Sequence, residues 1–407
     1  MAIGACCARE SEENLNPFDR IKAVPARGLA GYIARPIPGC HCSFVSSDLP
    51  REEPPKRLNR VQILRFFAAA AVVLFHSVAV AESRGLSPDV APWAVYGAQG
   101  VDLFFVISGC IIYYTVEVAG LTGGIFLRRR LERLLPLYWA FTLLVFAIGT
   151  LLPGMFASGG AARWMTVPNL ISSLLFVSLP TRHQTVIFVG WTLEFEMLFY
   201  ITTTLLLIIS KQPWTFVGVG LGAAVFMGRV GMPASPLLHF LTSPLMLEFL
   251  MGMVIAERLI KRRFNLALIV PLAIGLAASL PTFRDVWRIF LAGIPAAILV
   301  FALVRADLMV PIGKSAPTRT LMLLGDASYS IYLIQVLSVP ATFRLVLAVF
   351  PAFSLIALIF VAAITTLVAG LFSFVAFERP LMRFFRSRRK RRQDQLLPVR
   401  LELANPP

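Results

Sequence analysis

The sequence predicts an all-α, polytopic integral membrane protein with about ten transmembrane helices and both termini in the cytoplasm. Of its 407 residues, 57% are hydrophobic and only 15% are charged, and the mean hydropathy of +0.75 exceeds that of ordinary soluble proteins. The apolar residues gather in stretches of about the ~20 residues that a spanning helix needs. The 38 Lys and Arg outnumber the 22 Asp and Glu, for a net charge of +16. The positive-inside rule explains this excess, so it does not indicate nucleic-acid binding.

Residues 1–57 come before the first apolar stretch. They mix charges with Pro and Gly and contain no apolar run of signal-peptide length. We expect either a disordered cytoplasmic N-terminal extension or a start codon assigned too early, since the remainder is complete from about Leu58 onward. The triplet Cys40-His41-Cys42 lies here, but its spacing is too tight for an ordinary zinc site.

Ten apolar stretches follow, and each is predicted to be a transmembrane helix. They cover 61–81, 98–118, 132–152, 190–210, 214–230, 238–259, 265–282, 287–304, 322–349 and 352–377. Segment 168–180 is too short to cross and is bounded by Pro168 and Pro180, which predicts an interfacial or re-entrant piece. We therefore expect a membrane domain over 58–380 and a basic cytoplasmic tail over 381–407.

The basic residues set the predicted orientation. With ten crossings, the cytoplasmic side receives Arg128, Arg129, Arg130, Arg133, Lys211, Arg258, Lys261, Arg262, Arg263, Lys314, Arg319 and the run 386–392. An eleventh crossing would move the clusters at 258–263 and 386–392 to the outside, against the rule that sets orientation. The tail is most simply a topology anchor at the lipid surface.

Three ionisable residues lie at a similar depth near the outer side of the predicted bundle. His76, Asp102 and Glu196 are each about four to six residues from the outer end of their spans, which is a few ångströms of difference at ~1.5 Å per residue. A histidine beside carboxylates can act as a general base. Two other interpretations stay open: a hydrogen-bonded core histidine with Asp102 capping the second span, and a proton relay.

Arginines predict an anion site on the cytoplasmic side. Arg65 precedes His76 by eleven residues, so the two share a helix face about 16 Å apart. Arg129, Arg130 and Arg133 are spaced so that their guanidinium groups can converge, and such forks bind phosphates well. Positive-inside topology and a snorkelling arginine are the alternatives.

The run from Trp191 to Tyr200 carries a further polar stripe. Glu194 and Glu196 point to nearly opposite sides of a helix. Thr192 and Tyr200 share the face of Glu196, which favours Glu196 as the carboxylate that faces inward. Glu248 is a further carboxylate inside a predicted span, and the sequence names no partner for it.

Several ordered motifs together resemble the membrane acyltransferase-3 family and, within it, the exopolysaccharide-production acyltransferases. The likeness covers about residues 58–386. The motifs are Arg65 with His76, the run 100–109 (GVDLFFVISG), Arg129 to Arg133 with Pro136, Tyr138 and Trp139, the run from Trp191 to Tyr200, the run 324–333 (LGDASYSIYL) and the run 377–380 (FERP).

The resemblance implies a multi-pass enzyme of the bacterial inner membrane that moves an acyl group, usually acetyl, from cytoplasmic acyl-CoA to a carbohydrate hydroxyl. The acceptor would be a cell-surface polysaccharide or its lipid-linked precursor. His76 would act as general base or, as a second option, as a transient acyl carrier, and Glu196 and Asp102 would orient it. Arg65, Arg129, Arg130 and Arg133 would hold the CoA donor, and Trp191, Tyr200, Tyr332 and Gln335 would bind substrate.

Two features depart from the family pattern. Gln335 stands where many relatives carry a histidine, and relatives begin close to the first span. We expect no metal, because His41, His76, His183 and His239 show no ligand spacing on a shared face. The alternatives to a transferase are a transporter or flippase for a lipid-linked glycan, with His76, Asp102 and Glu196 as a proton relay, and a membrane scaffold for polysaccharide assembly.

Overall fold

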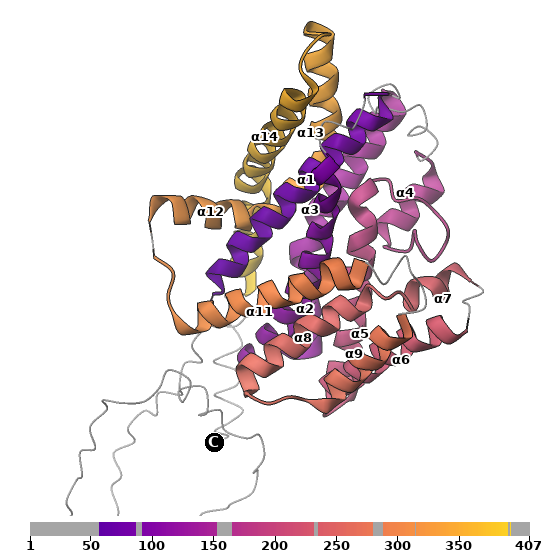
Figure 1. Cartoon of the computed structure of the whole chain (residues 1–407), viewed down its shortest axis with the longest axis vertical. Coiled ribbons are helices and arrows are strands. Elements are labelled where there is room, and N and C mark those ends of the chain that lie inside the picture. The colour runs from indigo at the N-terminus through magenta and orange to yellow at the C-terminus, as the bar shows by residue number, and fades with distance from the viewer. Residues whose placement is uncertain are drawn as a thin grey trace, which may run out of the picture. The chain divides into compact units, whose positions relative to one another are not determined.

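The computed structural model describes residues 57–86, 92–152, 165–231, 235–279, 288–313, 315–389 and 391, and in these ranges the ordered elements are helices, with no strand (Figure 1). Nine of the described helices are long and apolar enough to cross a membrane. The α-helices are α1 Asn59–Ser83, α2 Gly100–Ala119, α3 Gly123–Leu151, α4 Val167–Leu174, α5 Trp191–Ile209, α6 Pro213–Val230, α7 Pro236–Leu241, α8 Met246–Lys261, α9 Leu266–Ser279, α11 Ile294–Met309, α12 Ala316–Asp326, α13 Ser328–Val349 and α14 Leu355–Ser373. Shorter 3₁₀ and π segments extend them: η3 Pro92–Gln99, η5 Phe188–Gly190, η6 Ile289–Gly293 and η7 Phe374–Glu378.

The predicted fold class, an all-α polytopic membrane protein, is confirmed. The predicted spans correspond to the nine long helices and to α9, a shorter apolar helix of 14 residues. The predicted seventh span, 265–282, runs on into residues that lie outside the described ranges, as do the proposed extension up to residue 56 and residues 392–407 of the tail.

The predicted ninth span, 322–349, is wrong at its start. The chain forms two helices here, α12 and α13, and α12 runs to the side, away from the direction of α13 (Figure 1). Ser315 begins α12 by accepting the backbone N–H of Thr318 at 3.4 Å, with a proline in the first turn. The long apolar helix therefore begins at Ser328.

Segment 168–180 does not form a spanning helix. It contains α4, an eight-residue helix capped by Thr166, whose hydroxyl accepts the N–H of Asn169. The chain after α4 is held by Glu194 of α5, whose carboxylate accepts the N–H groups of Ser178 at 2.9 Å and Leu179 at 2.8 Å. Glu194 thus accepts the backbone N–H groups of this turn, and its carboxylate points away from that of Glu196.

Helices α2 and α8 pack backbone against backbone. A Cβ atom on Gly109 would lie 2.0 Å from the carbonyl oxygen of Phe249, and one on Gly252 would lie 2.1 Å from that of Val106. Only glycine permits this approach, which is a common device in membrane helix pairs. The contact makes α2 and α8 one structural unit that carries Asp102 and Glu248.

Helix α1 packs against α2, α11, α12, α13 and α14. A hydrophobic cluster joins α1 to α13 and α14 through Val73, Ile331, Phe343 and Ile359, which are all buried. His76 and Arg65 on α1 therefore face helices that come from both halves of the chain.

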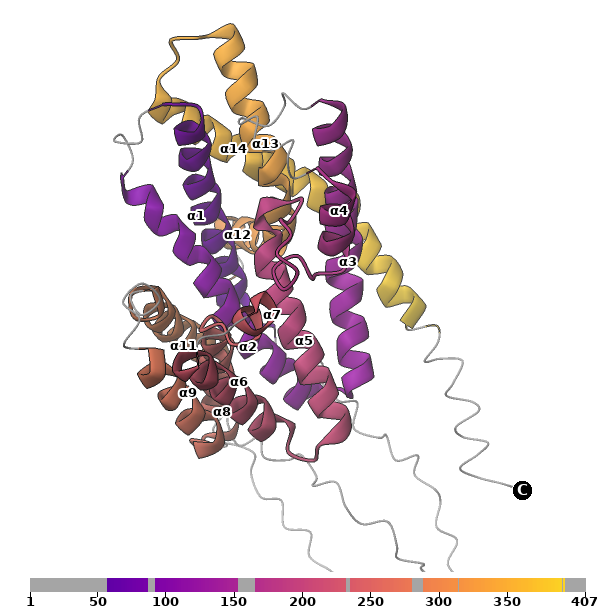
Figure 2. The ribbon, with the colours of Figure 1, turned by 90° about the vertical axis from the view of Figure 1, so that its right-hand side faces the viewer.

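Basic residues of several helices lie at one end of the bundle, which we call the basic end. Glu117 at the end of α2 accepts Lys261 of α8 at 2.8 Å. Glu132 of α3 accepts both Arg128 and Arg389 at 2.8 Å. Figure 2 shows the helix that contains α14 passing α3, and it continues through η7 as far as Arg389, beyond the predicted domain boundary at 380.

Candidate active site

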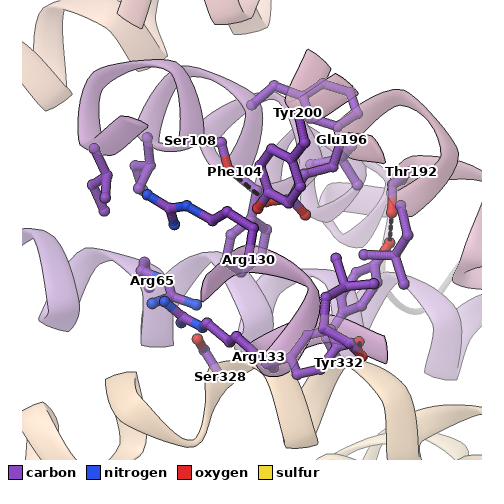
Figure 3. Close-up of a pocket in the computed structure, with 17 residues that line it drawn as sticks. Arg65, Phe104, Ser108, Arg130, Arg133, Thr192, Glu196, Tyr200, Ser328 and Tyr332 are labelled. Carbon is purple, nitrogen blue, oxygen red and sulfur yellow. Dashed lines mark hydrogen bonds between the residues drawn. The ribbon is translucent and has the colours of Figure 1, made fainter. Parts of the chain in front are cut away.

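A cavity of about 90 Å³ lies where α1, α2, α3, α5 and α13 meet (Figure 3). Its polar wall comes from residues far apart in the sequence. The polar lining residues are Arg65, Ser108, Arg130, Arg133, Thr192, Glu196, Tyr200, Ser328, Tyr329 and Tyr332. An internal cavity with several polar groups, in an otherwise apolar bundle, is the kind of place where a membrane protein holds a polar ligand.

Three arginines converge on this cavity. Arg65 comes from α1, and Arg130 and Arg133 come from one face of α3. Figure 3 shows Arg65 and Arg133 side by side, and the two charges are close enough to interact. Arg130 lies over the rings of Phe126 and Tyr200, 5.5 and 5.7 Å from their centroids. In the described part of the chain, none of the three forms a salt bridge with a carboxylate.

Ser328 adds an unused donor to the same wall. It lines the cavity beside Arg65 and Arg133 (Figure 3), and its hydroxyl is buried without a hydrogen-bond partner among the described residues. Buried polar groups are normally hydrogen-bonded, so an exception that lines a cavity points to a partner that enters the cavity. Three arginines and a free hydroxyl are suited to bind an anion.

Glu196 belongs to this cavity. Its Oε1 accepts hydrogen bonds from Ser108, at 2.9 Å, and from the Tyr200 hydroxyl. It also interacts electrostatically with Arg65 and Arg130. The structure therefore joins Glu196 to the arginines, whereas the sequence placed it beside His76.

His76 lies next to the cavity without lining it. Its Nδ1 is 3.0 Å from Oε1 of Gln335, and its ring packs edge-on against Phe188 at 4.7 Å. Gln335 in turn donates through Nε2 to the carbonyl of Tyr332 at 2.8 Å. Tyr332 is part of the cavity wall, so it connects the cavity to the His76–Gln335 pair.

Tyr332 is itself tightly held. Its hydroxyl shares a hydrogen bond of 2.8 Å with Thr192 and lies 3.2 Å from the carbonyl of Val189, the neighbour of Phe188. The ring of Phe104 packs edge-on against it. These contacts hold the Tyr332 ring in place in the cavity wall, beside the His76–Gln335 pair.

Asp102 is paired with Arg288, a residue that the sequence did not single out. Arg288 donates from Nε to Oδ1 at 2.8 Å and from Nη2 to Oδ2 at 3.4 Å. Asp102 is 1% exposed, and Arg288 also lies over the ring of Trp191 at 5.7 Å. The available signal was a basic residue at the predicted outer end of a span, where the positive-inside rule does not explain it.

Glu248 lies beside this pair. Its side chain is fully buried and interacts with both Asp102 and Arg288. Asp102, Glu248 and Arg288 form a cluster separate from the His76–Gln335 pair.

The remaining predicted residues fall outside the cavity wall. Arg129 is exposed, and Trp191 contacts Arg288 and Phe195. Gln335 lies against His76. Ser108, Ser328 and Tyr329 line the cavity, although the sequence placed them only within longer motifs.

Comparisons with a family model and with known proteins agree on one family. The model of the acyltransferase domain family matches residues 58–375. The chain is 32% identical over 312 residues to the exopolysaccharide production protein ExoZ of Rhizobium meliloti (strain 1021), covering 72% of this chain and 92% of that protein. It is 27% identical over 313 residues to the acyltransferase MdmB of Streptomyces mycarofaciens, covering 69% and 79%.

No solved structure matches the chain. The family match spans nearly the whole helical bundle, including every helix that contributes to the cavity. The chain therefore belongs to the acyltransferase-3 family and is a multi-pass membrane acyltransferase.

Proposed function

We propose that the protein is an O-acyltransferase of the bacterial inner membrane. It transfers an acyl group, which we propose is acetyl, from cytoplasmic acyl-CoA to a hydroxyl of a cell-surface polysaccharide or its lipid-linked precursor. The observation that carries this proposal is the convergence of Arg65, Arg130 and Arg133 in one buried cavity. Among the described residues no carboxylate forms a direct salt bridge with these arginines, although Glu196 and Glu378 attract them, so an anionic ligand would supply the direct charged partner that they lack.

The cavity supports a donor that carries phosphates. Guanidinium groups form two-pronged hydrogen bonds with phosphate oxygens, and coenzyme A carries several such groups at one end. Arg130 and Arg133 lie on the turns of α3 that follow the basic end. The pantetheine arm would then extend past Arg65 towards His76, a distance of about 16 Å along α1.

His76 is the proposed general base. Its neutral imidazole takes the proton of the acceptor hydroxyl as the hydroxyl oxygen attacks the thioester carbonyl carbon. The resulting tetrahedral intermediate breaks its carbon–sulfur bond, which leaves an ester on the acceptor. The CoA thiolate leaves and takes up the proton from the imidazolium, so the histidine is neutral again.

The acceptor class is supported by the similarity to ExoZ, whose name assigns it to exopolysaccharide production. A hydroxyl acceptor also fits the position of His76, which lies near the end of α1 opposite to the basic end. A sugar that approaches from that side would meet His76, while the CoA phosphates stay at the arginines.

The test is proton NMR of the surface polysaccharide from cells with and without the gene, complemented by wild type or by His76→Ala at equal membrane levels. We expect the O-acyl signals to vanish on deletion and to return with wild type alone. Full acylation in the His76→Ala strain would overturn the role of the histidine. Unchanged acylation in the deletion strain, with lower export of polysaccharide, would overturn the transferase and favour a transporter.

A further inference from the structure

We propose that Gln335 is a positioning residue that holds His76 in one tautomer, with the proton on Nδ1 and the free electron pair on Nε2. The proposal rests on the proposed function of His76 as general base and names the atom that acts. It gives a physical role to a residue that stands where the sequence departs from the family pattern.

The orientation of the Gln335 amide is fixed by its two partners. Nε2 lies 2.8 Å from the carbonyl oxygen of Tyr332, and a carbonyl oxygen can only accept a hydrogen bond. The amide nitrogen must therefore be the atom on that side. The reversed amide would place its oxygen against the carbonyl oxygen, which leaves two acceptors facing each other.

The amide orientation then determines the tautomer of His76. Oε1 of Gln335 faces Nδ1 of His76 at 3.0 Å, and an amide oxygen has no proton to donate. In a neutral imidazole one nitrogen carries the proton and the other accepts. Nδ1 must be the protonated nitrogen, so the electron pair that can take a proton from a hydroxyl is on Nε2.

The surroundings keep this arrangement in place. Gln335 is fully buried, so water does not compete for its amide. Tyr332 is anchored by Thr192 and by the carbonyl of Val189. The preceding residue, Phe188, packs on the imidazole ring of His76, with 4.7 Å between the ring centroids. The short segment η5 thus fixes both the ring of His76 and the partner of Gln335.

The carboxylates that the sequence offered for this role are engaged elsewhere. Asp102 pairs with Arg288, and Glu196 accepts from Ser108 and Tyr200. A neutral amide orients an imidazole as a carboxylate does in hydrolytic triads, but without a negative charge. Gln335 therefore selects the tautomer without trapping the proton on His76.

The first test is nitrogen NMR of the full-length protein, labelled with ¹⁵N-histidine in lipid nanodiscs at a pH where the imidazole is neutral. The chain has four histidines, and the signals of His76 are identified by their loss in His76→Gln. We expect protonated Nδ1 in wild type and in Gln335→Glu, whose carboxylate still accepts. In Gln335→Leu, where the backbone carbonyl of Val72 is the acceptor that remains for the imidazole, we expect a smaller share of this tautomer. Protonated Nε2 in wild type, or an unchanged tautomer in Gln335→Leu, would overturn the proposal.

The second test separates positioning from binding. Gln335→Leu should lower kcat by about 10²-fold or more, since general-base catalysis contributes about 10²–10⁴-fold. The KM for acyl-CoA should stay within about twofold, because the arginine cavity is untouched. The matched control is Ser338→Ala, one turn along α13, which loses a 2.7 Å hydrogen bond to Thr366 and should keep wild-type kcat. An equal loss in Ser338→Ala would show that α13 is merely destabilised and would overturn the specific role of Gln335.

The two tests distinguish this proposal from the function on which it rests. Full activity of His76→Ala would overturn the general base, whereas the NMR signal would still report on Gln335. Protonated Nε2 in a protein that His76→Ala inactivates would overturn only the role of Gln335.

Discussion

Arg65, Arg130 and Arg133 repel one another within a cavity that is largely removed from water. Like charges in a medium of low polarity destabilise the protein that holds them. An anionic ligand removes this repulsion, so binding and stability are coupled at this site. The free hydroxyl of Ser328 beside them also couples ligand binding to stability, because it gains a hydrogen-bond partner when a ligand binds.

Removing one of these charges should weaken the binding of acyl-CoA without destabilising the fold. Arg133→Gln should raise the KM for acyl-CoA about 10- to 100-fold, since a hydrogen bond to a charged group contributes about 1.5–3 kcal/mol. Its melting temperature without ligand should change little, because the repulsion between Arg133 and Arg65 is relieved while the attraction between Arg133 and Glu378 is lost. Steady-state kinetics and thermal unfolding in detergent check both.

Arg129→Gln is the matched comparison for this prediction. The sequence assigns Arg129 the same role as Arg133, but its side chain is exposed outside the cavity. We expect its KM to remain within about twofold, as for ordinary surface changes. An equal rise in both variants would mean that the donor is held outside the cavity.

The pair formed by Asp102 and Arg288 makes a second prediction at this scale. Asp102→Asn should lower the free energy of unfolding by about 1–3 kcal/mol, because Arg288 loses its carboxylate partner. Half-exposed Arg288 keeps part of its solvation, so the loss stays below that of a fully buried pair. Thermal unfolding of Asp102→Asn, Arg288→Gln and the double variant measures the coupling. Additive losses, with activity abolished in Asp102→Asn alone, would instead connect Asp102 directly to His76.

Sequence motifs locate much of the candidate site but not its pairings. Arg65, Arg133, Glu196 and Tyr332 were all predicted, and they line one cavity. Position along a span gives the depth of a residue in the membrane, but it does not say which helix lies beside it. His76 and Asp102 share a depth, yet their partners come from α13 and from the start of η6.

At the scale of elements, close helix packing depends on a few glycines. Gly109→Ala should markedly destabilise the protein, because the new methyl group would meet the backbone of Phe249, which cannot move aside like a side chain. Gly220→Ala on α6 is the control, since nothing lies within 4 Å of its added Cβ. This control should be neutral or more stable by about 0.5–1 kcal/mol. Thermal unfolding and the fraction of folded protein extracted from membranes check it, and equal stability of the two variants would contradict the close α2–α8 contact.

The sequence predicts a helix boundary where the hydropathy changes along the chain, and it misses a boundary that lies within one apolar run. Most ends of the long spans agree because apolar runs stop at turns, but α3 begins at Gly123 where the sequence predicted 132, and the last helix continues to Arg389 where it predicted 377, since both helices run on through basic residues. The break between α12 and α13 at Ala327 falls within a continuous moderately apolar run, and only the cap at Ser315 signals a separate helix. Pro136, Pro271 and Pro340 lie inside helices, so these three prolines mark no boundary; neighbouring helices re-satisfy the freed backbone groups in a membrane.

At the scale of the whole molecule, the charge distribution predicts one orientation in the membrane. At the basic end, Lys261 of α8 pairs with Glu117 of α2. Arg128 of α3 and Arg389 of the last helix both pair with Glu132 of α3. These clusters therefore lie on one side of the bundle. The positive-inside rule makes this side cytoplasmic.

Reporter fusions test this orientation. Alkaline phosphatase joined after His183, in the exposed connection between α4 and α5, should be active, because this enzyme requires an oxidising compartment. A fluorescent protein joined at the C-terminus should mature in the cytoplasm. The reverse result at both points would invert the orientation and place the arginine cavity where no acyl-CoA is made. If separate phosphatase fusions at both points were active, an even number of crossings would separate the two points, which would contradict the odd number formed by the seven segments α5, α6, α8, α9, η6–α11, α13 and α14 and the assignment of α12 outside the membrane.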